Sequence, residues 1–261
     1  MLAVAVRQGL TFGGELRAGD PGLELEAQSA VLRLAQADGI GIRLGRGHLM
    51  QPLKSVSMVF GVGIDLPDAA SAARFRQKYA IEGPFLLYVG RIHESKNVPE
   101  LLDYFQRYRR QTGDSLKLVL IGKSDLTLPD DPAIVHLGFL SDADKHDAIA
   151  AAALVVLPSL YESLSMITLE AWAGGTPVLV NEQCEVVKFL CRQSNGGLYY
   201  RTHDEFTAAL QHLLGSDALR RQMGAQGRQF VIRHYRPEVV VRHYTTLLDA
   251  ARSIRPGAAD L

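Results

Sequence analysis

The clearest pattern along the chain is a series of short, uncharged apolar runs, each followed by glycine, proline or polar residues. Apolar runs of this length predict strands that are buried on both faces of a sheet. The runs lie at 85–89, 117–121, 134–140 (a strand plus a turn), 154–157 and 178–180.

Helical patterns alternate with these runs. Asn97 is expected to cap one helix, with Pro99 in its first turn and Glu100 three residues further on. Glu182 and Glu185 are expected to open a helix that runs through Leu190. The other predicted helices are 23–37, 68–79, 142–153, 165–173, 205–214, 218–235 and 237–251.

Composition narrows the class of protein. With 261 residues, 47% hydrophobic and 21% charged, the chain has the make-up of an ordinary soluble globular protein. Lys and Arg (28) balance Asp and Glu (28), so nothing indicates a nucleic-acid partner. The two cysteines, Cys184 and Cys191, show neither a zinc spacing nor a disulfide framework, which fits a reducing cytosol.

No apolar run reaches 18 residues, and the opening Met-Leu-Ala-Val-Ala-Val is too short for a signal peptide. We therefore expect no membrane span and a cytoplasmic location.

Two carboxylates mark the stretch from Leu154 to Asn181. Glu162 lies in a polar loop, and Glu170 is the one charge in an otherwise apolar or small segment, with seven residues between them. A buried carboxylate needs a partner or a ligand, and the start of the helix suits a phosphate. Two simpler interpretations remain open. Glu162 could close a capping box with Ser159, and Glu170 could pair with an Arg or Lys.

Two cations flank the loop after the run 85–89. Gly90 lets the chain turn sharply there, and Arg91 and Lys96 lie between a strand's carboxyl end and a helix start. Ligands bind at this place in open α/β sheets, and an Arg and a Lys suit a diphosphate. The alternative is a pair of solvated surface cations.

Together these motifs resemble the retaining GT-B glycosyltransferases of the "glycosyl transferases group 1" kind. The family's Glu-x7-Glu signature is followed by a small-Gly-Thr-Pro-Val turn, as Glu162 and Glu170 are followed by 174–178. Its Gly-Arg-x4-Lys-(Asn/Gly) motif matches 90–97, and its Gly-(Val/Ile)-Asp after a short strand matches 63–65. The resemblance runs from about Val59 to about Asp249.

The resemblance implies a fold and a set of roles. The fold is α/β, a Rossmann-like parallel sheet with helices on both faces. Arg91 and Lys96 would hold the donor diphosphate, Glu162 would orient the donor sugar, and Glu170 would accept hydrogen bonds from ribose hydroxyls. The remaining donor-binding residues are Gly90, Gly138, Phe139, Leu140, Ser163, Leu164, Ser165 and Met166. No metal is expected, because the Asp142-Ala143-Asp144 sequence opens a predicted helix as its cap.

Three segments depart from the family pattern. The family commonly has Gly-Phe-Gly where this chain has Ser163-Leu164-Ser165, and a Gly-rich loop where it has 181–185. A second family glycine is replaced within Lys123-Ser124-Asp125. These departures leave the sugar and base of the donor open.

Three domains or segments are expected. Residues 1–57 form a short N-terminal segment, a truncated or degenerate remnant of an acceptor domain. Residues 58–236 form a nucleotide-sugar-binding domain, and residues 237–261 form a terminal helix and tail.

The expected function is transfer of a sugar from a nucleotide-sugar donor to an unknown acceptor with retention, in a hexosyltransferase. The alternatives are a non-catalytic donor-binding module that needs a separate acceptor domain or subunit, and another GT-B reaction such as an epimerase or a phosphorylase. The missing N-terminal domain leaves room for peripheral membrane contact, and the oligomeric state is open.

Overall fold

A computed structural model describes residues 62–67 and 69–253. A compact unit spans Ile64 to Arg233, and the residues from His234 onward belong to a separate unit. No helix in the described part of the chain is both long enough and apolar enough to cross a bilayer. The predicted domain boundaries stay a prediction.

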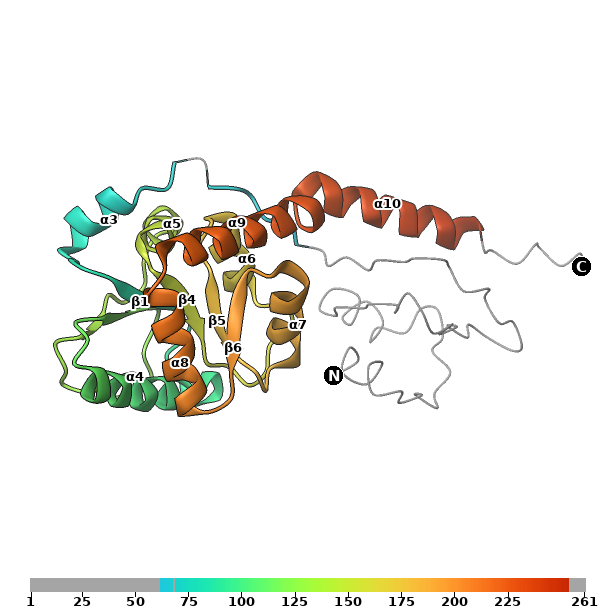
Figure 1. Cartoon of the computed structure of the whole chain (residues 1–261). Coiled ribbons are helices and arrows are strands. Elements are labelled where there is room, and N and C mark those ends of the chain that lie inside the picture. The colour runs from blue at the N-terminus through green and yellow to red at the C-terminus, as the bar shows by residue number, and fades with distance from the viewer. Residues whose placement is uncertain (1–61, 68, 254–261) are drawn as a thin grey trace, which may run out of the picture. The chain divides into compact units, whose positions relative to one another are not determined.

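The compact unit is built on a sheet of six strands in which every neighbouring pair is parallel (Figure 1). The strand order is β3-β2-β1-β4-β5-β6. The bounds are β1 Phe85–Val89, β2 Lys117–Ile121, β3 Ile134–His136, β4 Leu154–Leu157, β5 Val178–Asn181 and β6 Gly197–Tyr200. This confirms the predicted α/β fold with a parallel, Rossmann-like sheet.

A helix precedes β1, helices connect the other strands except β2 and β3, which a loop joins, and further helices follow β6. Their bounds are α3 Ala72–Tyr79, α4 Val98–Thr112, α5 Asp142–Ala151, α6 Met166–Ala173, α7 Glu185–Ser194, α8 His203–Leu214, α9 Asp217–His234 and α10 Pro237–Ser253. A short 3-10 turn, η1 (Glu94–Lys96), precedes α4.

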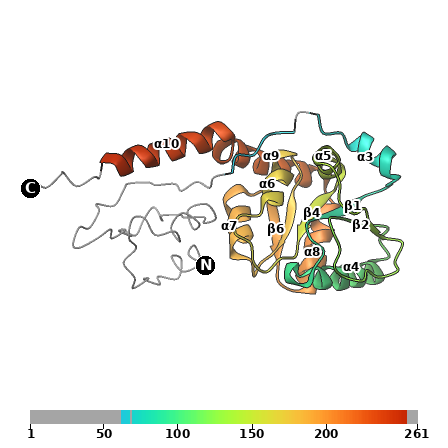
Figure 2. The ribbon, with the colours of Figure 1, turned by 180° about the vertical axis from the view of Figure 1, so that it is seen from behind.

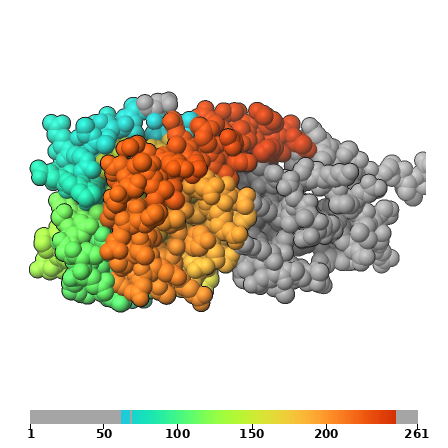
Figure 3. All heavy atoms as spheres, viewed as in Figure 1, coloured from blue at the N-terminus to red at the C-terminus, as the bar shows by residue number. Residues whose placement is uncertain are grey.

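The two faces of the sheet are covered by different helices. Alternate residues of the buried strands, such as Leu86 and Tyr88 of β1, pack with Phe105 of α4 and Phe206 of α8 in one apolar core. Figures 1 and 2 show α5 and α6 on the opposite side of the sheet. In the space-filling view α4 and α8 form neighbouring parts of the surface (Figure 3). Helices on both faces explain why the central strands β1 and β4 carry no charged residue.

Several predicted helix boundaries are wrong by two residues or more. The helix expected at 68–79 begins at Ala72, because the Ser71 side chain accepts a hydrogen bond from the Arg74 N–H and caps it. The helix expected from Glu182 begins at Glu185. The helix expected at 142–153 ends at Ala151. The short strand expected to begin at Val59 lies almost entirely outside the described residues, and the Gly63-Ile64-Asp65 segment expected to follow it is not in a helix or strand. The helix predicted at 23–37 and the segment 1–57 lie outside the described residues.

Candidate functional site

A cavity of about 310 Å³ opens at the carboxyl edge of the sheet, between the loops that follow β1 and β4. The strand order reverses between these two strands, because β2 and β3 extend the sheet beyond β1 whereas β5 and β6 extend it beyond β4. Such a switch point is where open α/β sheets bind ligands. The lining residues are Tyr88, Val89, Gly90, Lys96, Leu157, Ser159, Glu162, Ser163, Leu164, Ser165, Met166 and Ile167.

Two glycines bring the loops after β1 and β2 into close contact. A Cβ atom on Gly122 would lie 2.0 Å from the Gly90 carbonyl oxygen, so only glycine fits there. The Tyr88 hydroxyl donates a hydrogen bond to the Arg91 carbonyl oxygen at 2.8 Å and fixes the start of the β1 loop. Burial and the nearby Glu162 charge raise the pKa of Tyr88, so this phenol stays a neutral donor.

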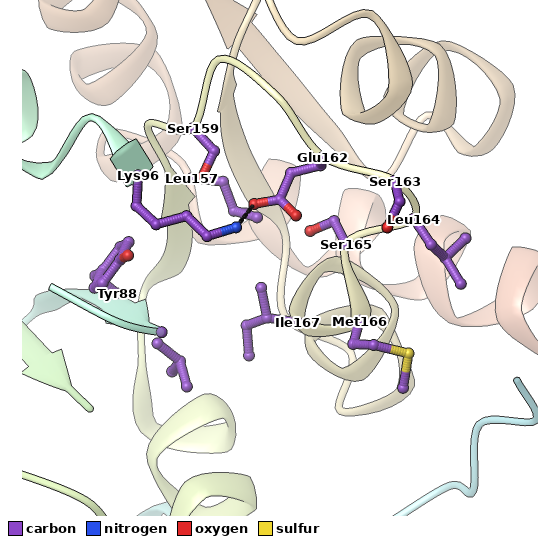
Figure 4. Close-up of a pocket in the computed structure, with 12 residues that line it drawn as sticks. Tyr88, Lys96, Leu157, Ser159, Glu162, Ser163, Leu164, Ser165, Met166 and Ile167 are labelled. Atoms are coloured by element: carbon purple, nitrogen blue, oxygen red, sulfur yellow. Dashed lines mark hydrogen bonds and ion pairs between the residues drawn. The ribbon is translucent and has the colours of Figure 1, made fainter. Parts of the chain in front are cut away.

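The central feature of the cavity is an ion pair between two predicted residues. Lys96 Nζ lies 2.7 Å from Glu162 Oε1, although 65 residues separate them along the chain. Figure 4 shows the two side chains reaching toward each other from opposite loops. Their side chains are 37% and 16% exposed, so the pair is accessible from the cavity. The capping-box interpretation of Glu162 does not hold, because a capping box needs a helix that begins directly after Ser159, and the next helix, α6, begins at Met166.

The start of α6 forms another wall of the cavity. Ser165 precedes the helix with a left-handed backbone (φ 62°), and its Oγ lies 2.8 Å from Thr168 Oγ1. The first N–H groups of a helix have no partner within it, and its dipole is positive at this end. The predicted residues Ser163, Leu164, Ser165 and Met166 therefore surround a place suited to an anion, as Figure 4 shows.

Arg91 is directed elsewhere in this structure. Its Nε lies 2.5 Å from Asp125 Oδ2, and it is not among the residues that line the cavity. The hydrogen bond from Arg91 lowers the pKa of Asp125 and keeps that carboxylate charged. Asp125 belongs to the segment that departs from the family pattern. The structure thus does not bring together Arg91 and Lys96, the two residues predicted to bind the diphosphate.

Glu170 lies in α6 and outside the lining of the cavity. Its Oε1 is 3.0 Å from Nζ of Lys145 in α5, and Lys145 also pairs with Asp142. The alternative of a paired carboxylate is therefore realised. Burial opposes the charge on Lys145, but the bonds to Glu170 and Asp142 outweigh it and raise its pKa. The ribose role of Glu170 stays a prediction.

The segment predicted to contact the base follows β3. The Gly122 N–H donates to the Gly138 carbonyl oxygen at 2.7 Å, which fixes this turn beside the β2 loop. Phe139 is 90% exposed, and Gly138, Phe139 and Leu140 do not line the cavity. They lie at the same edge of the sheet, and their role stays a prediction.

The predicted cap at Asp142 is wrong. Ser141 caps α5 by accepting a hydrogen bond from the Asp144 N–H, and Asp142 and Asp144 pair with Lys145 and Lys78. Among the described residues, no group of three or more His, Cys, Asp or Glu side chains is arranged to hold a metal ion.

Several residues around the site were not predicted from the sequence. Tyr88 and Ser159 line the cavity, and Asn181 is fully buried at the end of β5. A polar residue that ends a buried strand needs hydrogen-bond partners, and this signal could have identified Asn181. Lys145 and Asp125 carried no comparable signal, because their partners lie 25 and 34 residues away.

Comparison with known proteins gives one family match and several relatives. The family described as "Glycosyl transferases group 1" matches residues 71–230. A phosphatidyl-myo-inositol mannosyltransferase of Mycobacterium leprae is 28% identical over 201 residues, which are 73% of this chain and 53% of that protein. A D-inositol 3-phosphate glycosyltransferase of Nocardia farcinica is 31% identical, over 60% of this chain and 39% of that protein.

Solved structures share the fold. Sucrose-phosphate synthase from Thermosynechococcus elongatus superposes with a TM-score of 0.61 at 22% identity, over 74% of this chain and 52% of that one. Anabaena Alr3699/HepE in complex with UDP superposes with a TM-score of 0.62 at 16% identity, over 75% of this chain and 57% of that one. The chain spans about half the length, or less, of the curated relatives it matches.

Proposed function

Because the chain belongs to the glycosyl transferases group 1 family, we propose that its cavity binds a nucleotide-sugar donor and that the protein transfers the sugar to an acceptor with retention of configuration. The observation that carries this proposal is the Lys96–Glu162 pair in a cavity at the switch point of the sheet. A cation and a carboxylate that face the same space can bind a phosphate and a sugar hydroxyl, respectively.

Each charged group then has a distinct role. Lys96, together with the start of α6, neutralises the charge that develops on the leaving diphosphate. Arg91 joins it when it releases Asp125. Glu162, once Lys96 turns to the phosphate, accepts hydrogen bonds from hydroxyl groups of the donor sugar. Glu170 accepts from the ribose hydroxyls. In this scheme the protein's cations serve the diphosphate, and we expect binding to be independent of Mg²⁺.

Removal of Lys96 would cost on the order of 2–4 kcal/mol of transition-state stabilisation, by analogy with lost oxyanion-hole donors. The sugar and the acceptor are not part of the proposal. UDP is the first nucleotide to test, because Anabaena Alr3699/HepE, which has a similar fold, was solved with UDP.

The test is a calorimetric titration of the purified chain with UDP, GDP and ADP, each with and without Mg²⁺. We expect micromolar binding of one nucleotide, unchanged by Mg²⁺ and weakened in Arg91→Ala, Lys96→Ala and Glu170→Ala. Lys78→Ala is the control, because Lys78 pairs with Asp144 away from the cavity. Failure of all three nucleotides to bind would contradict the proposal. Binding without hydrolysis or transfer of the sugar would instead favour the non-catalytic donor-binding module.

A further inference from the structure

A second polar cluster lies next to the cavity, and the function proposed above assigns it no role. Its centre is Glu100 in the first turn of α4. Glu100 Oε1 accepts a hydrogen bond from Asn97 Nδ2 at 2.9 Å and another from Asn181 Nδ2 at 3.1 Å. We call these three residues the Glu100 cluster.

The Glu100 cluster connects the loops that follow β1 and β4 with the last residue of β5. Asn97 comes directly after Lys96 in the β1 loop, and its Nδ2 also donates to the Pro158 carbonyl oxygen at 3.2 Å. Pro158 is the first residue after β4 and begins the loop that carries Glu162. Asn181 ends β5, and its Oδ1 accepts from the Gln183 N–H at 2.9 Å. The cluster therefore joins the loop of Lys96 to the loop of Glu162.

The surroundings make these bonds hard to replace by water. Asn181 is 0% exposed, and a buried amide that loses its acceptor costs free energy. Asn97 holds a left-handed backbone (φ 56°), which asparagine tolerates better than most residues, and its side chain caps no helix N–H. That side chain is therefore committed to Glu100 and Pro158. Glu100 is partly buried, and this burial raises the pKa of its carboxyl group.

We propose that Glu100 is a positioning residue: through Asn97 and Pro158 it fixes the separation of the two loops that present Lys96 and Glu162 to the donor. This inference rests on the proposed function. Glu100 is not among the residues that line the cavity, so its effect on binding passes through the two loops. Small displacements of groups that must act together can reduce activity by large factors.

Two substitutions of Glu100 separate its role as a hydrogen-bond acceptor from the effect of its negative charge. Both cluster bonds go to the same oxygen, so Glu100→Gln can keep them with its carbonyl oxygen, whereas Glu100→Leu cannot. Asn97→Gly suits the positive φ and removes the bridge to Pro158, and it serves as a second variant if Glu100→Leu does not fold. Asp103→Leu is the matched control, on the same helix with a half-exposed side chain paired to Arg107.

The measurement is calorimetric binding of UDP to each variant, below its melting temperature. We expect Glu100→Leu and Asn97→Gly to weaken binding about tenfold, and Glu100→Gln and Asp103→Leu to stay within about twofold of the wild type. In a Lys96→Ala background, Glu100→Leu should add little further loss, because both changes act through Lys96. A purely structural role would lower the melting temperature but leave the affinity of the folded variant unchanged.

The inference is overturned if Glu100→Leu and Asn97→Gly bind UDP as tightly as the wild type does, or if their losses add fully to that of Lys96→Ala. A wild-type chain that binds neither UDP, GDP nor ADP would overturn the proposed function itself and this inference with it. The two failures are thus distinguishable by the behaviour of the wild type.

Discussion

At the scale of single residues, the proposed function requires an entering donor to break the ion pair of Lys96 and Glu162. In the pair each charge compensates the other. In the proposed function a diphosphate replaces Glu162 as the partner of Lys96, and Glu162 then accepts hydrogen bonds from sugar hydroxyls. The exchange of partners avoids leaving either charge buried and unpaired, which would be costly.

Asp147 is a different kind of carboxylate, which holds α3 against α5. It is 1% exposed and accepts hydrogen bonds from the Arg74 guanidinium at 2.5 Å and from the Ser71 N–H at 2.7 Å. Burial alone would raise the pKa of Asp147, but the bonds from Arg74 and Ser71 outweigh it, and the pKa lies below its ordinary value. A carboxyl group of this kind stabilises the fold only while it is ionised.

This predicts how stability depends on pH. Since the pKa of Asp147 is lower in the folded state, its contribution is present above the unfolded pKa of about 3.9 and is lost as the pH falls through the folded pKa. We expect Asp147→Asn to melt at a lower temperature than the wild type at pH 7, and the difference to narrow below about pH 4. Asp204→Asn, at a side chain 97% exposed, is the control. Equal melting temperatures of Asp147→Asn and the wild type at pH 7 would refute this role. Melting curves between pH 2 and pH 7 decide it.

The sequence indicated the types of these residues but not their partners. Lys96, Glu162 and Arg91 were recognised because each belongs to a motif beside the end of a predicted strand. Which charges meet depends on how loops distant in sequence approach one another, and Arg91 meets Asp125 instead of joining Lys96. Glu170 could be seen to need a partner from its apolar surroundings, but Lys145 could not be named.

At the scale of elements, α9 holds α6 through close backbone contact. Gly224 and Gly227 lie three residues apart and face the same way. A Cβ on Gly224 would lie 1.8 Å from the Gly175 carbonyl oxygen, and one on Gly227 would lie 2.3 Å from the Trp172 ring. Trp172 in turn donates from Nε1 to the Gly196 carbonyl oxygen at 2.8 Å. The glycines therefore let α9 pack against the end of the helix that carries Glu170.

We predict that Gly224→Ala lowers the melting temperature, because its new methyl group meets a backbone carbonyl that cannot move aside cheaply. Overpacking of this kind costs about 1–3 kcal/mol, which outweighs the gain of up to about 1 kcal/mol in helix propensity. Gln229→Ala, at an exposed position of the same helix, should leave the melting temperature nearly unchanged. Thermal unfolding of both variants is the measurement. A more stable Gly224→Ala would show that the helix does not pack in this way.

Most elements could be predicted from the apolar pattern because buried parallel strands and their connecting helices differ clearly in period and length. The ends were less predictable. Ser141 caps α5 where Asp142 was expected to, and Ser71 caps a helix that begins later than predicted, since a cap depends on local backbone geometry that the pattern does not encode. The close packing of Gly224 was also invisible, because a glycine in a helix looks only unfavourable until its neighbour is known.

At the scale of the whole molecule, the order of the strands decides where function lies. The reversal between β1 and β4 separates the loops that follow them and opens the cavity there. The order of strands along the sequence does not give their order in the sheet. The position of the site was therefore predicted from the motifs and from the family that they resemble. The chain spans about half of its relatives' length, and the residues that form the cavity do not indicate an acceptor.

The central claim is that Lys96 binds the terminal phosphate of the donor's nucleotide. Calorimetric titration of the wild type and Lys96→Ala with UDP and UMP, or with the diphosphate and monophosphate of the base that binds best, tests it directly. We predict that the wild type binds UDP more tightly than UMP, and that Lys96→Ala loses about tenfold or more for UDP but little for UMP. Equal losses for both nucleotides, or no loss for UDP, would contradict the claim.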